Sequence, residues 1–404
     1  MTDQTTDSAP LEASARDLLR RHPLVDGHND LPWAIREQFG GDPVGARLAE
    51  PVPQTQTDLP RLAAGGVGAQ FWSVYVPASL AGANNEPNNE PNNEHCAVTA
   101  VLEQIDTAHR MIEAYPDRLE LATTAADVER VFAAGKVASL LGAEGGHCIA
   151  SSLGVLRSLY ALGVRYMTLT HNNNVGWADS ATDRPQAGGL TDFGREVVGE
   201  MQRLGMLVDL SHVASSTMRD ALDVARAPVI FSHSSARAVC DHPRNVPDEI
   251  LRSLADNGGV CMATFVPNFV SPECAQWQFG LLAEMERRGL DRRDISAWGS
   301  VSPEYERAHP FPEATLAQVA DHVEHIRAVA GIEHVGIGGD YDGSARMPAG
   351  LADVSRYPAL FAELLDRGWT EDECAALAGG NVLRVLKAAE SEAANQASAV
   401  PGDG

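Results

Sequence analysis

The sequence predicts one α/β domain folded as a (β/α)8 TIM barrel. Three observations support this fold class: eight short apolar runs rich in β-branched residues recur along the chain, stretches with helical spacing separate them, and no linker divides the 404 residues. Strands that alternate with helices form a parallel sheet. At this chain length we expect the sheet to close into a barrel, and an open doubly wound sheet is the alternative.

The predicted strands are short and alternate with longer helical stretches. They cover residues 24–28, 67–76, 137–144, 164–171, 206–212, 228–233, 258–266 and 334–339. Helical spacing of apolar side chains is clearest over 194–205 and over 316–331, where Gly331 is placed to end the helix. This regular alternation is what favours a barrel with its helices outside.

Two insertions interrupt the predicted barrel domain, which we place at residues 21–390, between an N-terminal segment (1–20) and a flexible C-terminal tail (391–404). The first insertion, NNEPNNEPNNEH at 84–95, is a low-complexity polar run typical of a solvated loop. The second, at 277–300, is long enough to form a helix or a lid near the mouth of the barrel. Neither insertion contains an obvious chemical motif.

The composition is that of a globular protein, with 44% hydrophobic and 21% charged residues. The chain has 31 basic and 55 acidic residues, a formal charge of -24, which disfavours nucleic acids and anionic membranes as partners. No apolar run approaches the ~18 residues that span a bilayer, and the first residues lack the pattern of a secretory signal, so we expect a cytoplasmic protein. The six cysteines form no CxxC pair, which argues against a cysteine zinc site or a redox motif.

Imidazole and carboxylate side chains follow six of the predicted strands at the point where each strand ends. They are His28, Asp30, Glu144, His171, His212, His233 and Asp340. His28 and Asp30 are two residues apart, so on an extended chain they point to the same side. In (β/α)8 barrels the carboxyl ends of the strands form the face that carries active sites. We therefore expect these side chains to converge at the mouth of the barrel.

This set of side chains is suited to divalent cations. Imidazole and carboxylate without thiolate are typical ligands of zinc, manganese and similar ions. The set is larger than one tetrahedral ion needs, and it fits two ions about 3.5–4 Å apart that share a carboxylate and a hydroxide. Such ions lower the pKa of the shared water, which supplies a nucleophile near neutral pH, and they polarise a substrate carbonyl or phosphoryl oxygen.

Other polar residues are expected to lie outside this centre. His322 and His325 belong to a helix with an apolar stripe, and we expect them to be an exposed pair; no HExxH motif is present. His147 is expected to support the site without binding metal. Asp209 and Asp342 are near the site in sequence, but the alternation of side chains points them elsewhere.

The motifs occur together in a recognisable order. They are VDGHNDLPW, QFWSVY, GAEGGH, TLTHNNN with GWAD, DLSH, FSHSSA, RNVPD and GGDYDG. In this order they resemble the renal (membrane) dipeptidase family of zinc peptidases, from about Leu24 to Lys387. The resemblance implies a TIM barrel with an amidohydrolase-like binuclear site at its C-terminal face.

The resemblance also implies the metal ligands. His28 and Asp30 would hold one cation, His212 and His233 the other, and Glu144 would bridge the two. The implied cofactors are two divalent ions, Zn²⁺ in this family. The implied activity is hydrolysis of dipeptides, including L,D-dipeptides, by a metal-bridging hydroxide, and dimers are common in the family.

Three further residues acquire roles by the same resemblance. His171 would contact the substrate carbonyl and the tetrahedral intermediate, and Asp340 would position the bridging water and carry its proton to the leaving amine. Arg244, in HPRNVP, would bind the C-terminal carboxylate of the substrate, because a guanidinium binds both carboxylate oxygens.

The chain departs from the family pattern at the substrate end. A pocket tyrosine of the family corresponds to Phe269, and the asparagines of HNNN remove one family disulfide, although Cys240 and Cys274 could still pair. Two alternative functions stay open: another two-metal hydrolase, such as a lactonase or phosphotriesterase-like enzyme, and a non-catalytic metal-binding protein. Arg244 argues against the first, since neutral esters offer no carboxylate.

Overall fold

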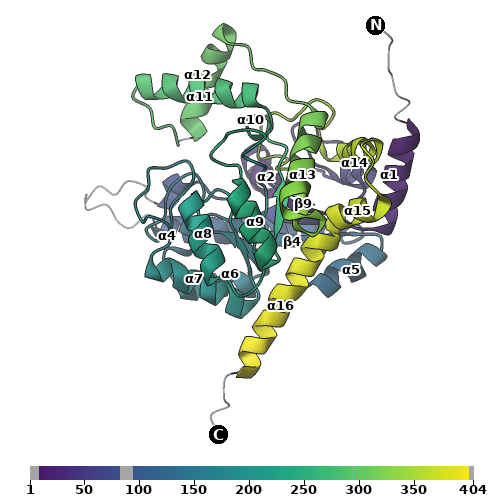
Figure 1. Ribbon diagram of the computed structural model, residues 1–404, viewed down its shortest axis with the longest axis horizontal. Coiled ribbons are helices and arrows are strands. Elements are labelled where there is room, and N and C mark those ends of the chain that lie inside the picture. Colours follow the sequence, from purple (N-terminus) through teal and green to yellow (C-terminus); the bar gives the residue numbers. More distant parts are fainter. Residues whose placement is uncertain (1–8, 82–93, 294, 400–404) are drawn as a thin grey trace.

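The computed structural model describes residues 9–81, 94–293 and 295–399, and it contains a closed barrel of eight parallel strands (Figure 1). The barrel strands are β1 (Leu24–Asn29), β2 (Val67–Ser73), β4 (Val137–Glu144), β5 (Val164–Thr168), β6 (Leu207–Asp209), β7 (Ile230–Phe231), β8 (Val260–Ala263) and β9 (Val335–Ile337), and a further strand, β3 (Leu119–Leu121), pairs with β4. The barrel order is β1-β2-β4-β5-β6-β7-β8-β9, and it closes where Asp26 of β1 pairs with Ile337 of β9. The predicted fold class is confirmed.

One strand was not predicted, and it lies outside the barrel. β3 pairs with the first residues of β4, 137–139, while β5 pairs with the end of β4, 141–144. β1 and β4 extend at least to the end of their predicted runs, whereas the other six predicted strands end earlier than their apolar runs suggest. His212 and Asp340 have φ of 67° and 61°, so the chain leaves the extended conformation just where the polar residues begin.

Helices surround the barrel (Figure 1). They are α1 (Ala9–Arg21), α2 (Leu31–Phe39), α3 (Leu59–Gly65), α4 (Glu94–Ala114), α5 (Ala125–Ala133), α6 (Leu153–Ala161), α7 (Asp192–Leu204), α8 (Ser215–Val224), α9 (Asp248–Asn257), α10 (Pro267–Val270), α11 (Pro272–Arg287), α12 (Ile295–Ala308), α13 (Leu316–Ala330), α14 (Tyr357–Asp366), α15 (Glu371–Ala375) and α16 (Asn381–Ala399). Short helical turns are η1 (Ala78–Ala81), η2 (Gly146–Ile149), η3 (Ile332–His334), η4 (Val354–Arg356) and η5 (Ala376–Gly380). Residues 391–399, expected to be a flexible tail, continue α16 as helix.

The two predicted insertions differ in what the structure describes. Most of the first, residues 84–93, lies outside the described residues, and α4 begins at Glu94. The second forms α11 and α12, which project from the barrel as a pair (Figure 1). The pair has a small apolar cluster of its own that includes Leu281, Met285 and Val301. The insertion is therefore a packed helical unit.

The barrel interior is apolar below the strand ends. One buried cluster contains side chains from seven barrel strands, among them Tyr166 of β5 and Met262 of β8. Tyr166 fits because β4 has a glycine opposite: a Cβ on Gly142 would lie 2.0 Å from the Tyr166 ring. The tyrosine ring thus fills the barrel centre, and its hydroxyl points toward the carboxyl ends of the strands.

The expectation that His322 is exposed is wrong. His322 of α13 is buried: its Nδ1 accepts the N–H of Ala236 (3.1 Å), and its Nε2 lies 3.0 Å from the carbonyl oxygen of Val270. Two backbone groups need this imidazole, which explains why a polar residue faces inward. His325 is half-buried, with Nε2 2.8 Å from Asp248 Oδ1.

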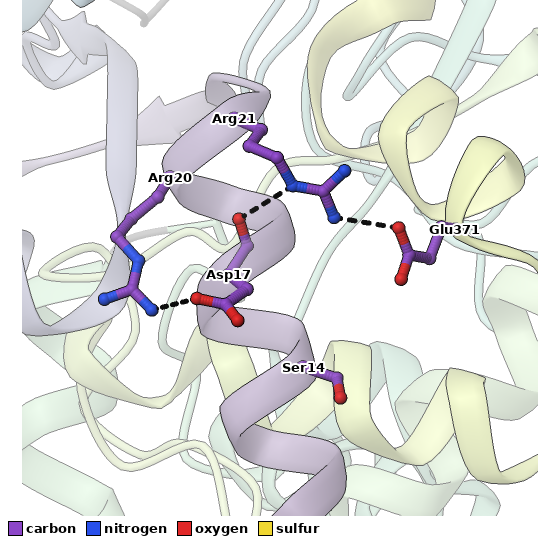
Figure 2. A pocket seen from close by; sticks show the side chains of 5 residues that line it. All are labelled: Ser14, Asp17, Arg20, Arg21 and Glu371. Carbon is purple, nitrogen blue, oxygen red and sulfur yellow. Dashed lines mark hydrogen bonds and ion pairs between the residues drawn. The ribbon is translucent and has the colours of Figure 1, made fainter.

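The outer surface of α1 carries a polar pocket lined by Ser14, Asp17, Arg20, Arg21 and Glu371 (Figure 2). Arg21 bonds Glu371 of α15 at 2.8 Å, and Arg20 bonds Asp17. These exposed charges pair with one another, and the pocket contains no imidazole. Over the described ranges no helix has both the length and the apolar character needed to cross a bilayer.

Candidate metal centre

Glu144, the last residue of β4, lies at the centre of the polar cluster. Its Oε1 is 3.0 Å from His212 Nε2, 3.5 Å from His233 Nε2 and 3.9 Å from His171 Nε2. Its Oε2 faces the other way and lies 3.6 Å from His28 Nε2. The carboxylate therefore has one oxygen on each side, which is the arrangement that a bridging ligand needs.

The ligand atoms form three overlapping groups, each within 4.8 Å. The groups are His28, Glu144 and His233; Glu144, His171 and His212; and His28, Asp30 and Asp340. All seven side chains predicted from the strand ends belong to at least one group. The structure thus brings the predicted set together at one end of the barrel.

Asp30 and Asp340 approach each other because a glycine stands beside them. A Cβ on Gly343 would lie 2.2 Å from Asp30 Oδ2 and 2.3 Å from Asp340 Oδ1. The backbone N–H of Asp340 donates to the carbonyl of His28 (3.2 Å), which joins the end of β9 to the end of β1. Any side chain at Gly343 would push the two carboxylates apart.

A buried aspartate orients the histidine of β7. Ser232 Oγ donates to Asp209 Oδ2 (2.6 Å) and lies 2.8 Å from His233 Nδ1. Because Ser232 donates its hydroxyl proton to Asp209, it can only accept a hydrogen bond from His233. Nδ1 of His233 therefore carries the proton, and Nε2 keeps a free lone pair. Asp209 also accepts from Thr168 Oγ1 (2.5 Å) and the N–H of Ser211 (3.0 Å), so it ties the ends of β5, β6 and β7.

The residue that holds His28 comes from inside the barrel. Tyr166 places its hydroxyl 2.7 Å from His28 Nδ1, which aims Nε2 at the cluster. His28 Nε2 is buried and makes no well-aligned hydrogen bond within the described parts of the chain; Asp30 Oδ2 (3.3 Å) and Glu144 Oε2 (3.6 Å) face it. A buried nitrogen of this kind needs a partner, and a cation would provide it.

The donor atoms fit divalent ions. His212 Nε2 and His233 Nε2 lie 2.9 Å apart, a separation that suits two nitrogens bound to one cation at about 2.0–2.1 Å each. Burial lowers the pKa of both imidazoles, and of His171, well below the usual value, so these rings are neutral and can offer lone pairs. Burial also raises the pKa of Glu144, which adds to the need for a nearby cation.

Arg244 lies next to the cluster but pairs with no acid. Its side chain is 2% exposed, and its NH1 and NH2 make only long contacts, to Ser234 Oγ (3.3 Å) and the carbonyl of His233 (3.4 Å). Among the described residues no carboxylate is within ion-pair distance of it; burial lowers its pKa to about 10, although Asp340, Glu144 and Asp209 act on it electrostatically from farther away. The ring of Phe269 lies 5.1 Å from its Cζ.

Several polar residues around the centre belong to none of the three groups. Asp342 accepts the N–H of Gln56 (2.6 Å) and His147 Nε2 lies 2.8 Å from the carbonyl of Val76. Cys240 and Cys274, which could have paired, are free thiols. Tyr166 was missed in the sequence because it stands in an apolar strand and has the pattern of a core residue.

The comparisons with known proteins agree with this geometry. Residues 12–400 match the model of the family described as membrane dipeptidase (peptidase family M19). The chain belongs to the membrane dipeptidase family. Its relatives include Dipeptidase 3 of Macaca fascicularis, 43% identical over 391 residues (96% of this chain, 69% of that protein), and Dipeptidase 3 of Mus musculus, 43% identical over 385 residues (94% and 67%). The chain is thus an enzyme of the metallodipeptidase class, as the resemblance implied.

Solved structures share the fold of this membrane dipeptidase family member. The probable dipeptidase PvdM from Pseudomonas aeruginosa has a TM-score of 0.81 at 24% identity, covering 95% of this chain and 99% of that chain. A metallo peptidase from Rhodobacter sphaeroides, liganded with a phosphinate mimic of the dipeptide L-Ala-D-Ala, has a TM-score of 0.72 at 25% identity, covering 91% and 99%.

Proposed function

We propose that this chain hydrolyses small dipeptides, L,D-dipeptides included, with two divalent cations, Zn²⁺ by the family resemblance. The observation that carries the proposal is the buried guanidinium of Arg244, which forms no ion pair with a carboxylate in the described part of the chain. A buried charge without a partner is costly, so this position favours an anionic ligand. A free C-terminal carboxylate distinguishes a dipeptide from a neutral ester or a lactone.

The proposed ligands divide at Glu144. Its Oε2 faces His28, which stands with Asp30, and its Oε1 faces His212 and His233. This division supports one cation on each side with Glu144 between them. When bound, the cations supply an activated water and polarise the scissile carbonyl.

Two further residues serve the reaction in this proposal. His171 is neutral because it is buried, and it stands beside the cluster, so it can donate a hydrogen bond to the substrate carbonyl and to the oxyanion that forms from it. Asp340 lies with Asp30 and His28 and is assigned to carry a proton to the leaving amine. Cytoplasmic residence and a homodimer stay predictions of the sequence.

The test is a substrate panel on protein reconstituted with Zn²⁺. It contains L,L- and L,D-dipeptides, the same dipeptides as C-terminal amides, and lactones. We expect kcat/KM for the free acids to exceed that for the amides by about 100-fold, because only the acids pair with Arg244. Hydrolysis of lactones without hydrolysis of dipeptides would overturn the proposal, and the metal-free protein is the blank.

Asp340→Asn tests the assigned proton transfer. We expect kcat to fall by about 10²–10⁴-fold while the content of both cations stays unchanged, because the amide cannot carry a proton. Steady-state kinetics and elemental analysis measure the two quantities. Asp342→Asn is the matched control, since Asp342 accepts a backbone N–H outside the three ligand groups; equal turnover of the two variants would contradict the role.

A further inference from the structure

A buried histidine connects the helical insertion with the loop that carries Arg244. The backbone N–H of Arg244 donates to Nδ1 of His242 (3.2 Å), and Nε2 of His242 lies 2.9 Å from Oε1 of Gln278 in α11. His242 and Gln278 are 3% and 5% exposed. A continuous chain of buried hydrogen bonds therefore runs from the insertion to Arg244.

The direction of these hydrogen bonds is fixed. Nδ1 of His242 accepts from Arg244, so the proton of the neutral ring is on Nε2, which donates to Gln278. Burial lowers the pKa of His242 to about 3, so the ring stays neutral near physiological pH. Gln278 is thus the acceptor that a neutral His242 requires in this orientation.

Two aromatic rings pack against the imidazole of His242. The ring centroid of Phe269 lies 4.6 Å from that of His242, and the ring of Phe279 stacks on it at 5.5 Å with an interplanar angle of 2°. Phe269 also lies under the guanidinium of Arg244. Gln278 and Phe279 are neighbours in α11, so one short stretch of the insertion supports both the hydrogen bond and the stack.

The guanidinium itself is weakly held. Its contacts to Ser234 Oγ and to the carbonyl of His233 are 3.3 and 3.4 Å long, and its buried Nε has no partner in the described part of the chain. Hydrogen bonds of this length contribute little. The position of the Arg244 side chain therefore depends on where its backbone is fixed.

We propose that His242 and Gln278 are positioning residues that fix Arg244 for the carboxylate of the substrate. This inference rests on the function proposed above. In this role the insertion takes part in substrate binding, because α11 determines how tightly the C-terminal end of the dipeptide is held.

The first test compares two glutamines of the same helix. Gln278→Met removes the acceptor at nearly equal length, and Gln276→Met makes the same change at an exposed position of α11. We expect Gln278→Met to raise KM for a dipeptide about tenfold with kcat within about twofold, and to leave kinetics on the dipeptide amide unchanged. Equal KM values for the two variants, or equal effects on acid and amide, would overturn the inference.

The second test changes the histidine. His242→Asn can keep an acceptor for the N–H of Arg244, whereas His242→Leu removes it. We expect KM for the dipeptide to stay within about threefold in the first variant and to rise about tenfold in the second. Melting temperatures of all four variants identify any that fails to fold. If Gln278→Met fails to fold, the comparison of His242→Asn with His242→Leu decides the question.

A crystal structure separates this inference from the proposed function. If the wild-type protein hydrolyses no dipeptide, the proposed function fails, yet the position of Arg244 can still be compared in Gln278→Met and Gln276→Met. We expect the guanidinium to leave Ser234 and the carbonyl of His233 only in Gln278→Met. If the guanidinium of Arg244 keeps its position in Gln278→Met, the positioning role is overturned, whether or not the protein hydrolyses dipeptides.

Discussion

Two histidines of the candidate metal centre are oriented by a hydrogen bond on the nitrogen that faces away from Glu144. Tyr166 bonds Nδ1 of His28 at 2.7 Å, and Ser232 bonds Nδ1 of His233 at 2.8 Å. Such outer partners fix the ring orientation of a metal-binding imidazole and commonly change metal affinity when they are removed.

Tyr166→Phe tests this dependence at a single atom. The ring still fills the barrel against Gly142, but His28 loses the partner of its Nδ1. We expect metal affinity to fall about 10–100-fold with little loss of fold stability, measured by competition with a chelating dye. Tyr160→Phe, on α6, is the control; an equal affinity in both variants would show that the hydroxyl does not hold His28.

The residues that converge at the candidate metal centre could be predicted from the sequence, but the residues that support them could not. His28, Glu144 and His212 stand where apolar runs end, and parallel strands bring such positions to one face. Tyr166 is different because it lies within an apolar run, and only the closing of the barrel across a glycine brings its hydroxyl to His28. Gln278 contacts His242, 36 residues earlier in the sequence, and through it supports Arg244, 34 residues earlier. No local sequence pattern indicates this contact.

At the level of elements, α7 shows how local signals fix a helix. Thr191 Oγ1 accepts the N–H of Gly194 at its start, and Gly205 has a left-handed φ of 82° at its end. Apolar side chains such as Val197 and Met201 form its buried face. These are sequence-local features, so this helix was predicted to within two residues at its start and one at its end.

Two glycines of α7 give a matched pair of predictions. Gly199 is exposed and a Cβ there meets no atom within 4 Å, so Gly199→Ala should stabilise the protein by about 0.5–1 kcal/mol through helix propensity. Gly194 is buried, and a Cβ there would lie 2.5 Å from the carbonyl oxygen of Trp177, so Gly194→Ala should destabilise it. Urea denaturation measures both changes; shifts of the same sign would show that the space around the Cβ does not decide the effect.

We expect the stability that His322 of α13 contributes to depend on pH. Burial lowers the pKa of His322 to about 4, against about 6.5 in an unfolded chain. Between these values the unfolded chain binds a proton that the folded chain does not. The stability contributed by the neutral ring is therefore complete above about pH 6.5 and is lost as the pH falls toward 4, by at most about 1.4 kcal/mol per pH unit.

His322→Gln removes this titration. The variant is expected to be less stable than wild type at about pH 7, because two backbone groups lose their partner. The difference in free energy of unfolding between the two proteins should shrink as the pH is lowered to about 5. A difference that is constant with pH would show that His322 is not neutral in the folded protein.

For the whole molecule, the cations should add to stability. Glu144, Asp30 and three histidines converge in one buried place, and a ligand bound only by the folded state stabilises it by about 2.7 kcal/mol at 100 times its Kd. We expect a chelator to lower the Tm by a few degrees and added Zn²⁺ to restore it, as followed by calorimetry. A Tm that is unaffected by the chelator would contradict cation binding at this site.

The carboxylate of Asp209 has a consequence for how the enzyme acquires its ions. It joins the ends of three neighbouring strands through Thr168, Ser211 and Ser232, and none of these bonds involves a cation. We therefore expect the histidines that follow these strands to keep their positions in the metal-free protein. If that is so, ions could be exchanged in the folded protein without refolding, and we expect the metals available to the folded enzyme to determine which ion occupies the centre.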